Sequence, residues 1–368
     1  MTIVFFISGH GFGHASRDVE VINALGSAAP APRIIVRSAV SADLLRRTLR
    51  VPYELRPGAC DTGIVQATSI THDDERTIDA ALDFYRDWDA RVEAESRALA
   101  GEAVSVIVGD VPPLAFEVAA RLKVPSVAIA NFTWDWIYET HPGFAARGGQ
   151  VIQTIREAYR HATLALELPF AGGFEVFPSV RQTPLVARRP TQPRAATRAH
   201  FGLPLDRPAV LLSFGGYGLP SLDLTMLDCL DEWTVVTTDR VSDASRALPA
   251  GVVAIVEAAF LTSEIRYEDL VAAADVVLTK PGYGILAECI STGTAMLYTS
   301  RGQFREYDVM VREMPRYVRC RFIDHADLFG GRWRAALETL RAQPPAPELM
   351  PTDGARVAAR AILEIARG

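Results

Sequence analysis

Near its N-terminus the chain carries the glycine-rich stretch Ser8-Gly9-His10-Gly11-Phe12-Gly13-His14-Ala15-Ser16-Arg17. A short apolar run, Ile3 to Ile7, precedes it. A helical pattern follows, with apolar residues at Val19, Ile22 and Leu25. This order predicts a strand, a tight turn and a helix start. Glycines allow close approach to a ligand, and a helix start directs free N–H groups at it. Two histidines make the turn a candidate for catalysis as well as binding.

Length and composition limit the possible classes of protein. A chain of 368 residues suits two domains. Its 49% hydrophobic and 22% charged residues are ordinary for a soluble globular protein. The net charge of −6 gives no reason to expect nucleic acid or an anionic membrane as a partner. We interpret two basic runs, Arg188-Arg189 and Arg312 to Arg321, as solvated surface.

No targeting or metal-binding pattern stands out. No apolar run approaches the roughly 20 residues of a membrane span, so no transmembrane segment is expected. The N-terminal apolar run is too short for a signal peptide and lacks a basic region before it. The cysteines form no CxxC pair, which argues against a zinc site or a disulfide framework; they are Cys60, Cys229, Cys289 and Cys320. This usage fits a reducing compartment, so a cytoplasmic location is predicted.

Apolar strands alternate with amphipathic helices over the first half of the chain. Strands are predicted at Arg33 to Val40, Tyr53 to Leu55, Val104 to Val108 and Ser126 to Ala130. One continuous helix of about six turns is predicted from Ile78 to Leu99. The Asp87-Trp88-Asp89 segment lies within it, with its carboxylates on different faces, and is interpreted as surface. The alternation predicts a parallel, doubly wound sheet that binds ligands beyond the carboxyl ends of its strands.

Polar side chains follow three of these strands. They are His10 and His14, then Asp110, then the segment Asn131 to Trp136. The carboxyl ends of parallel strands lie at one edge of a sheet, so these residues could converge there. Two alternatives remain open: Asp110 could cap the next helix, and the aromatic residues of the last segment could serve packing.

The opening turn does not match the usual phosphate-binding motifs. Its glycines are spaced G-x-G-x-G, and the second strand ends Val36-Arg37-Ser38 without an acidic residue for a ribose hydroxyl. Both features argue against an NAD site. The turn also lacks the lysine and the following serine or threonine of a P-loop.

A segment rich in proline and arginine, 169–200, contains the predicted junction between the two halves of the chain. We predict a first domain over 1–170, a linker over 171–185 and a second domain over 186–368, whose last helix is a candidate to cross back to the first. The strand Ala209 to Ser213 leads into Phe214-Gly215-Gly216-Tyr217-Gly218, so this domain opens as the first does. Further strands are predicted at Thr234 to Thr238, Val252 to Val256, Val276 to Thr279 and Ala295 to Tyr298.

The most informative stretch of the second domain is Thr279-Lys280-Pro281-Gly282-Tyr283-Gly284-Ile285-Leu286-Ala287-Glu288. Gly282 and Gly284 could present N–H groups to a diphosphate at the positive end of a helix. Glu288, further along that helix, could accept bonds from a ribose diol. An unliganded turn is the alternative. The polar segment Arg301 to Glu306 follows the next strand at the same sheet edge.

These features resemble the GT-B glycosyltransferases, which are α/β proteins with two Rossmann-like domains whose parallel sheets face each other across a cleft. The peptidoglycan N-acetylglucosaminyltransferase type is the most similar form. The opening turn also resembles the G-x-G-x-G-H-x-x-R turn of predicted glycosyltransferases. A similarity to the N-terminal, non-kinase half of plant L-arabinose kinases spans nearly the whole chain, at Gly63 to Gln66, Asp110 to Pro112, Asn131 to Asp135 and Lys280 to Gly284. Arabinose phosphorylation is not expected without the kinase half.

The resemblance implies that the N-terminal domain holds the acceptor and the C-terminal domain the nucleotide sugar. It implies a general base at His14. On chemical grounds His10 is the rival base, and Asp110 could orient the imidazole as in a triad. The predicted donor-binding residues are Gly215, Gly216, Tyr217, Lys280, Gly282, Tyr283, Gly284, Glu288, Gln303, Arg305 and Glu306; among them Lys280 departs from the family and could add a positive charge near the phosphates. The predicted acceptor-side residues are Gly11, Gly13, Arg17, Asn131 and Trp134. The sugar is not implied, because Arg305-Glu306 replaces the family's paired glutamines.

The function predicted from the sequence is sugar transfer from a nucleotide sugar, UDP-linked, to the hydroxyl of a small-molecule or glycan acceptor. Histidine suits proton removal near pH 7, and helix N–H groups can stabilise the leaving diphosphate without a metal. We therefore predict inversion, no metal and no cofactor besides the substrate. The alternatives are a nucleotide-sugar epimerase or hydrolase on the same fold, and a non-catalytic nucleotide-sugar sensor.

Overall fold

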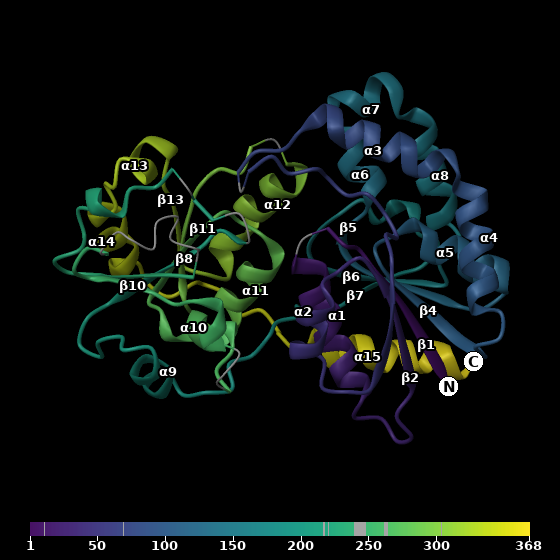
Figure 1. Cartoon of the computed structure of the whole chain (residues 1–368), viewed down its shortest axis with the longest axis horizontal. Helices are drawn as coiled ribbons and strands as arrows, with labels where there is room; N and C mark the ends of the chain where they lie inside the picture. Colours follow the sequence, from purple (N-terminus) through teal and green to yellow (C-terminus); the bar gives the residue numbers. More distant parts are fainter. Residues whose placement is uncertain are drawn as a thin grey trace.

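The computed structural model describes residues 1–368 except 11, 69, 216, 217, 220, 239–247, 261–263 and 303. The chain forms two α/β domains that lie side by side (Figure 1). The described residues build one parallel sheet in each domain, with seven strands in the N-terminal and six in the C-terminal domain. A hydrophobic core lies on either face of each sheet. The predicted α/β architecture with two parallel sheets is confirmed.

The N-terminal sheet has the strand order β3-β2-β1-β4-β5-β6-β7. Its strands are β1 (Thr2–Ile7), β2 (Arg33–Ser38), β3 (Tyr53–Pro57), β4 (Val104–Asp110), β5 (Ser126–Phe132), β6 (Leu164–Gly172) and β7 (Val180–Gln182). Ile7, the last residue of β1, lies opposite Asp110, the last residue of β4. The Ser8 N–H also donates to the Asp110 carbonyl over 3.0 Å. The glycine-rich turn therefore begins beside Asp110.

The helices of this domain are α1 (Phe12–Leu25), α2 (Ala42–Thr48), α3 (Asp74–Arg86), α4 (Trp88–Leu99), α5 (Pro113–Leu122), α6 (Trp134–Glu139), α7 (Pro142–Arg147) and α8 (Gly149–Tyr159). The prediction of one continuous helix from Ile78 to Leu99 is wrong. The helix breaks at Asp87, whose backbone is non-helical (φ −104°, ψ 31°). The sequence pattern hides the break because α3 and α4 bury their apolar faces in the same core, so the apolar spacing continues across it.

The C-terminal sheet has the strand order β10-β9-β8-β11-β12-β13. Its strands are β8 (Ala209–Ser213), β9 (Thr234–Thr237), β10 (Val252–Ala254), β11 (Val276–Thr279), β12 (Ala295–Tyr298) and β13 (Cys320–Phe322). The helices are α9 (Arg194–His200), α10 (Tyr267–Ala273), α11 (Tyr283–Thr292), α12 (Arg305–Glu313), α13 (His325–Phe329), α14 (Arg334–Ala342) and α15 (Gly354–Arg367). Short 3₁₀ helices occupy Phe174–Val176, Leu224–Met226, Glu257–Phe260 and Met314–Arg316.

Strand β7 lies inside the segment predicted as a linker, 171–185. It pairs with β6 in parallel, with Ala165 opposite Val180, so the first sheet continues to Gln182. Glycine and proline between the two strands suggested a linker, but here they accompany a turn that leads to an edge strand.

The last helix, α15, leaves the C-terminal domain and packs against α1 of the N-terminal domain (Figure 1, yellow). Ala358, Ala361 and Ile362 are buried in the core on that face of the first sheet. Figure 1 also shows the two chain ends near each other on this domain. Both ends of the chain therefore contribute to one core.

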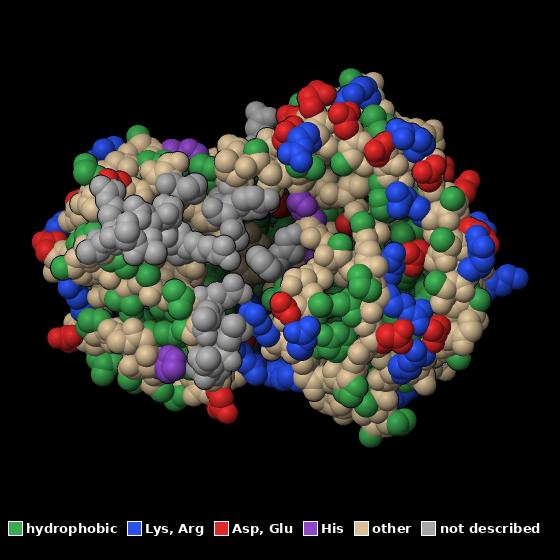
Figure 2. Space-filling view, viewed as in Figure 1, with side chains coloured by type: hydrophobic (Ala, Val, Ile, Leu, Met, Phe, Trp, Pro, Cys, Tyr) green, Lys and Arg blue, Asp and Glu red, His purple; other side chains and the backbone are tan. Residues whose placement is uncertain are grey.

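Acidic and basic side chains are interspersed over the face of the N-terminal domain that Figure 2 shows. The charged side chains on that face are therefore neither uniformly acidic nor uniformly basic. Within the described ranges, no helix combines the length and the apolar character that crossing a membrane requires.

Replacing Ile362 by alanine should lower the free energy of unfolding by about 2–5 kcal/mol, because it opens a cavity in the N-terminal core. Ile362 is fully buried, whereas Leu349, in the segment before α15, is 97% exposed. Leu349→Ala is the matched control and should change stability by less than about 0.5 kcal/mol. Urea unfolding measures both, and equal effects would contradict the docking of α15 on this core.

Candidate active site

The first turns of α1 carry the predicted base. His14 and Arg17 are three residues apart, so their side chains project from one face of the helix. Both are 8% exposed, and both reach Asp110 at the carboxyl end of β4, which is 1% exposed. The structure therefore brings this histidine and this arginine together with a carboxylate that lies more than ninety residues further along the chain.

Asp110 binds both partners at once. His14 Nδ1 lies 2.8 Å from Asp110 Oδ1, and Arg17 Nε donates to Oδ2 over 2.8 Å. A second Arg17 nitrogen donates to Oδ1. Burial opposes ionisation of Asp110, but the charges of Arg17 and His14 outweigh it and hold the pKa of the carboxyl below its usual value. Asp110 is therefore an ionised carboxylate at neutral pH.

The partner of His14 determines which ring nitrogen is free for chemistry. A carboxylate can only accept, so in the neutral ring Nδ1 carries the proton and donates to Asp110. An Arg17 nitrogen also lies 3.2 Å from Nδ1, farther away than the carboxylate. The other nitrogen, Nε2, keeps the lone pair that a general base requires. The ring packs edge-on against Phe132, with centroids 5.5 Å apart.

Sequence reasoning missed two buried carboxyl groups beside this cluster. Asp18 is fully buried, and neither of its carboxyl oxygens has a hydrogen-bond partner in the described part of the chain. Burial and then the charge of Asp110 raise the pKa of Asp18 well above its usual value. The available sequence signal was its spacing, four residues after His14 on the same helix.

Asp61 is the second missed carboxyl. It accepts from Ser8 Oγ over 2.9 Å and from Trp134 Nε1 over 2.8 Å. Burial raises its pKa to about 6, against the effects of His14 and of these two donors. It lies in the segment between β3 and α3, where no periodic apolar pattern marks a buried position, so the sequence offered no signal for this role.

His10, the rival base, lies in a tight site. A Cβ built on Gly63 would come 2.3 Å from His10 Cγ, so only glycine fits there, and Gly63 also has a φ of +60°. Burial lowers the pKa of His10 to about 4, assisted by the charges of His14, Arg301 and Lys280. His10 is therefore neutral at pH 7, close to two cationic side chains of the C-terminal domain.

Three residues predicted for the acceptor side have partners inside the protein. Arg17 donates to Asn131 Oδ1, and Asn131 Nδ2 donates to the Pro169 carbonyl over 2.6 Å. Trp134 is 2% exposed and is held by Asp61. The bonds of Arg17 and Asn131 tie α1 to β5 and β6. The buried position of Trp134 fits the alternative that the aromatic residues of this segment serve packing.

In the C-terminal domain, the motif after β11 forms the start of α11. Gly282 is the N-cap residue of this helix. A Cβ built on Gly284 would lie 3.9 Å from Gly13 Cα, so the starts of α1 and α11 meet at the domain boundary. The Tyr283 hydroxyl donates to the Phe170 carbonyl over 3.2 Å. The predicted diphosphate turn is thereby brought next to the turn that carries the predicted base.

Glu288 lies further along α11 and is 2% exposed. Its Oε1 accepts two hydrogen bonds from Arg188, and the one from Nε spans 2.8 Å. The other oxygen, Oε2, has no hydrogen-bond partner among the described residues. Burial raises the pKa of Glu288, and the charge of Arg188 offsets part of that rise. Arg188 also lies 3.3 Å from Glu268.

The prediction that Arg188 is solvated surface is wrong. Its side chain is 19% exposed and lies between two carboxylates. Those carboxylates stand 80 and 100 positions further along the chain, so no local window could have revealed the pairing.

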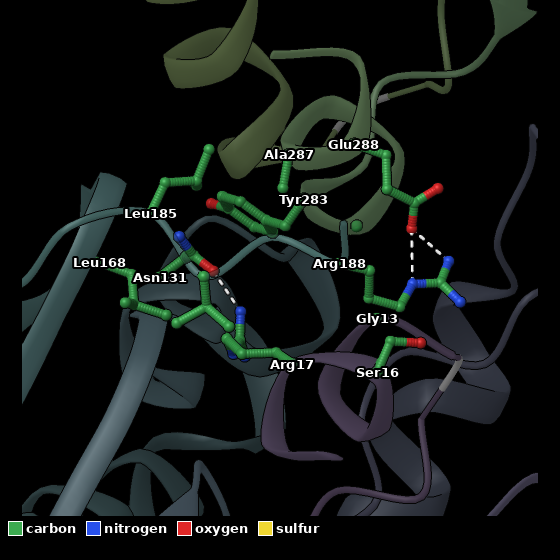
Figure 3. Close-up of a pocket in the computed structure, with 12 residues that line it drawn as sticks. Gly13, Ser16, Arg17, Asn131, Leu168, Leu185, Arg188, Tyr283, Ala287 and Glu288 are labelled. Carbon is green, nitrogen blue, oxygen red and sulfur yellow. Dashed lines mark hydrogen bonds and ion pairs between the residues drawn. The ribbon is translucent and has the colours of Figure 1, made fainter. Parts of the chain in front are cut away.

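A pocket lies between the two domains, and Figure 3 shows Tyr283 and Ala287 of α11 facing Asn131 and Arg17 across it. It is lined by Gly13, Ser16, Arg17, Asn131, Leu168, Leu185, Val186, Arg188, Tyr283, Gly284, Ala287 and Glu288. Residues of both predicted sets, donor and acceptor, therefore share one pocket.

The residues that follow β11 and β12 form a second polar group. Arg301 donates to Glu306 over 3.0 Å. Burial, and then the charge of Arg301, lower the pKa of Lys280 to about 8. Arg305 instead donates to the Trp136 carbonyl over 2.6 Å, so it bridges to the N-terminal domain. Arg305 was predicted to bind the donor together with Lys280 and Glu306, and in the structure its side chain contacts the N-terminal domain.

The first glycine turn of the C-terminal domain is described at Gly215, whose φ of +73° suits glycine. Ser213 at the end of β8 lies opposite Thr279 at the end of β11, so Gly215 and Lys280 follow the same edge of the sheet. Four predicted residues lie outside the described residues: Gly11, Gly216, Tyr217 and Gln303.

Solved glycosyltransferases have a similar fold. The glycotransferase of kitacinnamycin matches with a TM-score of 0.64 and 20% identity, over 100% of this chain and 96% of that one. UGT89C1 of Arabidopsis thaliana, complexed with UDP, matches with a TM-score of 0.61 and 13% identity, over 99% and 94%. The chain has the GT-B fold.

One curated relative supports the resemblance from sequence. L-arabinokinase of Arabidopsis thaliana is 28% identical, over 100% of this chain and 35% of its own length. The chain thus spans about a third of that relative. No family model matches the chain. The predicted resemblance to GT-B glycosyltransferases and plant L-arabinose kinases is confirmed.

Arg188→Met should destabilise the protein by about 3–5 kcal/mol at neutral pH, because it leaves the buried Glu288 without its cation and leaves Glu268 with the more distant Arg266, 3.9 Å away. The folded-state pKa of Glu288 already lies above its ordinary value of 4.5. Above that pH the folded state binds more protons than the unfolded state, so stability falls as pH rises. Removing the cation raises that pKa further, so it should steepen this fall above the ordinary pKa of 4.5.

Urea unfolding at several pH values measures the effect. Arg189→Met is the matched control: Arg189 is exposed and donates to Thr352 Oγ1 over 3.0 Å. It should change stability by less than about 0.5 kcal/mol. The same pH slope in both variants would contradict a structural role for Arg188.

Proposed function

We propose that this chain is a glycosyltransferase that moves a sugar from a nucleotide sugar, UDP-linked, to an acceptor hydroxyl. The observation that supports it most is the position of His14, bound through Nδ1 to Asp110, where the start of α1 meets the start of α11. A base with a free Nε2 then lies beside a helix N-terminus of the kind that binds diphosphates. Proteins of similar fold complexed with UDP and with dTDP support a nucleoside diphosphate as the leaving group.

In this proposal, His14 Nε2 accepts the proton of the acceptor hydroxyl as its oxygen attacks the anomeric carbon. The bond between that carbon and the phosphate oxygen breaks in the same step. Asp110 stabilises the imidazolium that forms, and Arg17 keeps Asp110 ionised. General base catalysis of this kind contributes roughly 10²–10⁴-fold to the rate.

The leaving nucleoside diphosphate gains negative charge, which the N–H groups at the start of α11 can stabilise. Lys280 would add a positive charge there, because its pKa of about 8 leaves it mostly protonated at neutral pH. These groups allow departure without a metal at the diphosphate. Attack from the side opposite the leaving group would invert the anomeric carbon.

For the nucleotide, we propose that Glu288 Oε2 accepts the ribose hydroxyls. This oxygen has no hydrogen-bond partner among the described residues, while Arg188 holds Oε1 and orients the carboxylate. A buried acceptor without a partner is costly, which favours a ligand that donates to it. Glu306, held by Arg301, is the candidate acceptor for hydroxyls of the donor sugar.

His14→Ala should lower sugar transfer by roughly 10²–10⁴-fold and leave UDP affinity nearly unchanged, because the base contacts the acceptor and not the nucleotide. Transfer is measured as nucleoside diphosphate release from UDP-sugars with a panel of acceptors, and UDP binding by calorimetry. His10→Ala is the matched control and should retain transfer. Normal turnover in His14→Ala would refute the assignment, and release that is independent of acceptor in the unsubstituted protein would indicate a hydrolase.

Glu288→Gln should weaken UDP binding by about 1–3 kcal/mol, which is roughly a 5–150-fold rise in Kd. Glutamine keeps an acceptor for Arg188 but replaces the other oxygen by a donor. Glu268→Gln is the matched control, because Glu268 also faces Arg188 but does not line the pocket. Calorimetric titration with UDP measures both, and an equal affinity of the two variants would exclude the ribose role.

A further inference from the structure

Three side chains outside the candidate active site converge on one point of the N-terminal domain. His72 precedes α3, Asp74 is its first residue, and His141 is the N-cap of α7. His72 Nε2 and His141 Nε2 each lie 2.9 Å from the same oxygen, Asp74 Oδ1. One ligand atom of each residue lies within 4.8 Å of the others. Figure 1 shows α3 and α7 next to each other at the top of this domain.

The two imidazoles lack the hydrogen bonds that buried rings normally make. His141 is 7% exposed, yet neither of its ring nitrogens has a hydrogen-bond partner among the described residues. Its Nε2 is near the Asp74 carboxylate but is not aligned with it as a hydrogen bond. His72 Nδ1 is also buried without a partner. Buried polar groups are nearly always paired, so this arrangement requires an explanation.

We propose that His72, Asp74 and His141 bind a divalent transition metal, Zn²⁺ or an ion of similar preference. Two imidazoles and one carboxylate are a donor set that Zn²⁺ uses, at about 2.0–2.2 Å from each ligand atom. Ligand atoms on a tetrahedral ion at those distances are roughly 3.3 Å apart. Small side-chain shifts from the observed 2.9 Å separations reach that spacing. Water completes the coordination.

Local structure holds the ligands in place before any metal binds. The Asp73 N–H donates to the Val65 carbonyl over 2.8 Å, and the Asp73 side chain caps α3 at Arg76. The His141 N–H donates to the Tyr138 carbonyl over 3.1 Å. The backbones on both sides of the site are therefore fixed by bonds that do not involve the ligand atoms.

The site also adjoins the C-terminal domain. The His72 ring packs edge-on against Phe304, with centroids 5.0 Å apart. A Cβ built on Gly302 would lie 3.9 Å from the His72 ring. The ion would join the loop before α3 to α7 at the domain boundary. It shares no ligand with the His14 cluster, so it is compatible with transfer that needs no metal at the diphosphate.

Calorimetric titration of chelator-treated full-length protein with ZnCl₂ tests the site. One Zn²⁺ per chain should bind, and Co²⁺ in its place should give the visible absorption of a four-coordinate ion. Asp74→Asn, at a half-exposed position where misfolding is not expected, should lower Zn²⁺ affinity by at least tenfold, and so should His72→Ala and His141→Ala. His161→Ala is the matched control, because His161 is exposed and pairs with Glu117, which is not one of the proposed ligands.

Two outcomes would overturn the site: no stoichiometric Zn²⁺ binding to the unsubstituted protein, or equal binding in Asp74→Asn and His161→Ala. UDP binding is measured separately on the same preparations. A failure of the metal site is therefore distinguishable from a failure of the proposed transfer function.

Discussion

The buried ion pair between Arg17 and Asp110 is the interaction on which the candidate active site depends. Arg17 reaches from α1 to the end of β4 and, through Asn131, to the Pro169 carbonyl. Removing one partner of such a pair costs about 3–5 kcal/mol, because the other is left as an uncompensated buried charge. Since Arg17 keeps Asp110 ionised, the carboxylate can accept from His14 Nδ1 and leave Nε2 for chemistry. Packing and chemistry therefore rely on one carboxylate.

The same helix start also brings the domains together. Gly13 of α1 and Gly284 of α11 face each other at the domain boundary, where a Cβ built on Gly284 would lie 3.9 Å from Gly13 Cα. Arg305 adds a bond from the C-terminal domain to the Trp136 carbonyl. The helix that carries the candidate base and the candidate diphosphate turn are thus neighbours across the domain boundary.

Much of the fold could be predicted because its signals are local. The predicted bounds of β8, β11 and β12 match those of the structure, since buried parallel strands are continuous apolar runs. The meeting of His14 and Asp110 could be anticipated because parallel strands end at one sheet edge. The pairing of Arg188 with Glu288 could not be, and neither could that of Asp61 with Trp134. Each joins loop or helix residues far apart in the chain, where no periodicity or turn chemistry connects them.

The α/β class, the two parallel sheets and the glycine turns at the strand ends can be predicted from local sequence patterns. These features follow from apolar spacing and backbone freedom within windows of a few residues. The ionisation of Asp110, the free Nε2 of His14 and the burial of most of the Arg188 side chain are instead consequences of the three-dimensional fold. Those properties depend on which groups lose water together and which charges then face each other. Long-range packing determines which groups are buried and which charges are neighbours, and no short stretch of sequence carries that information.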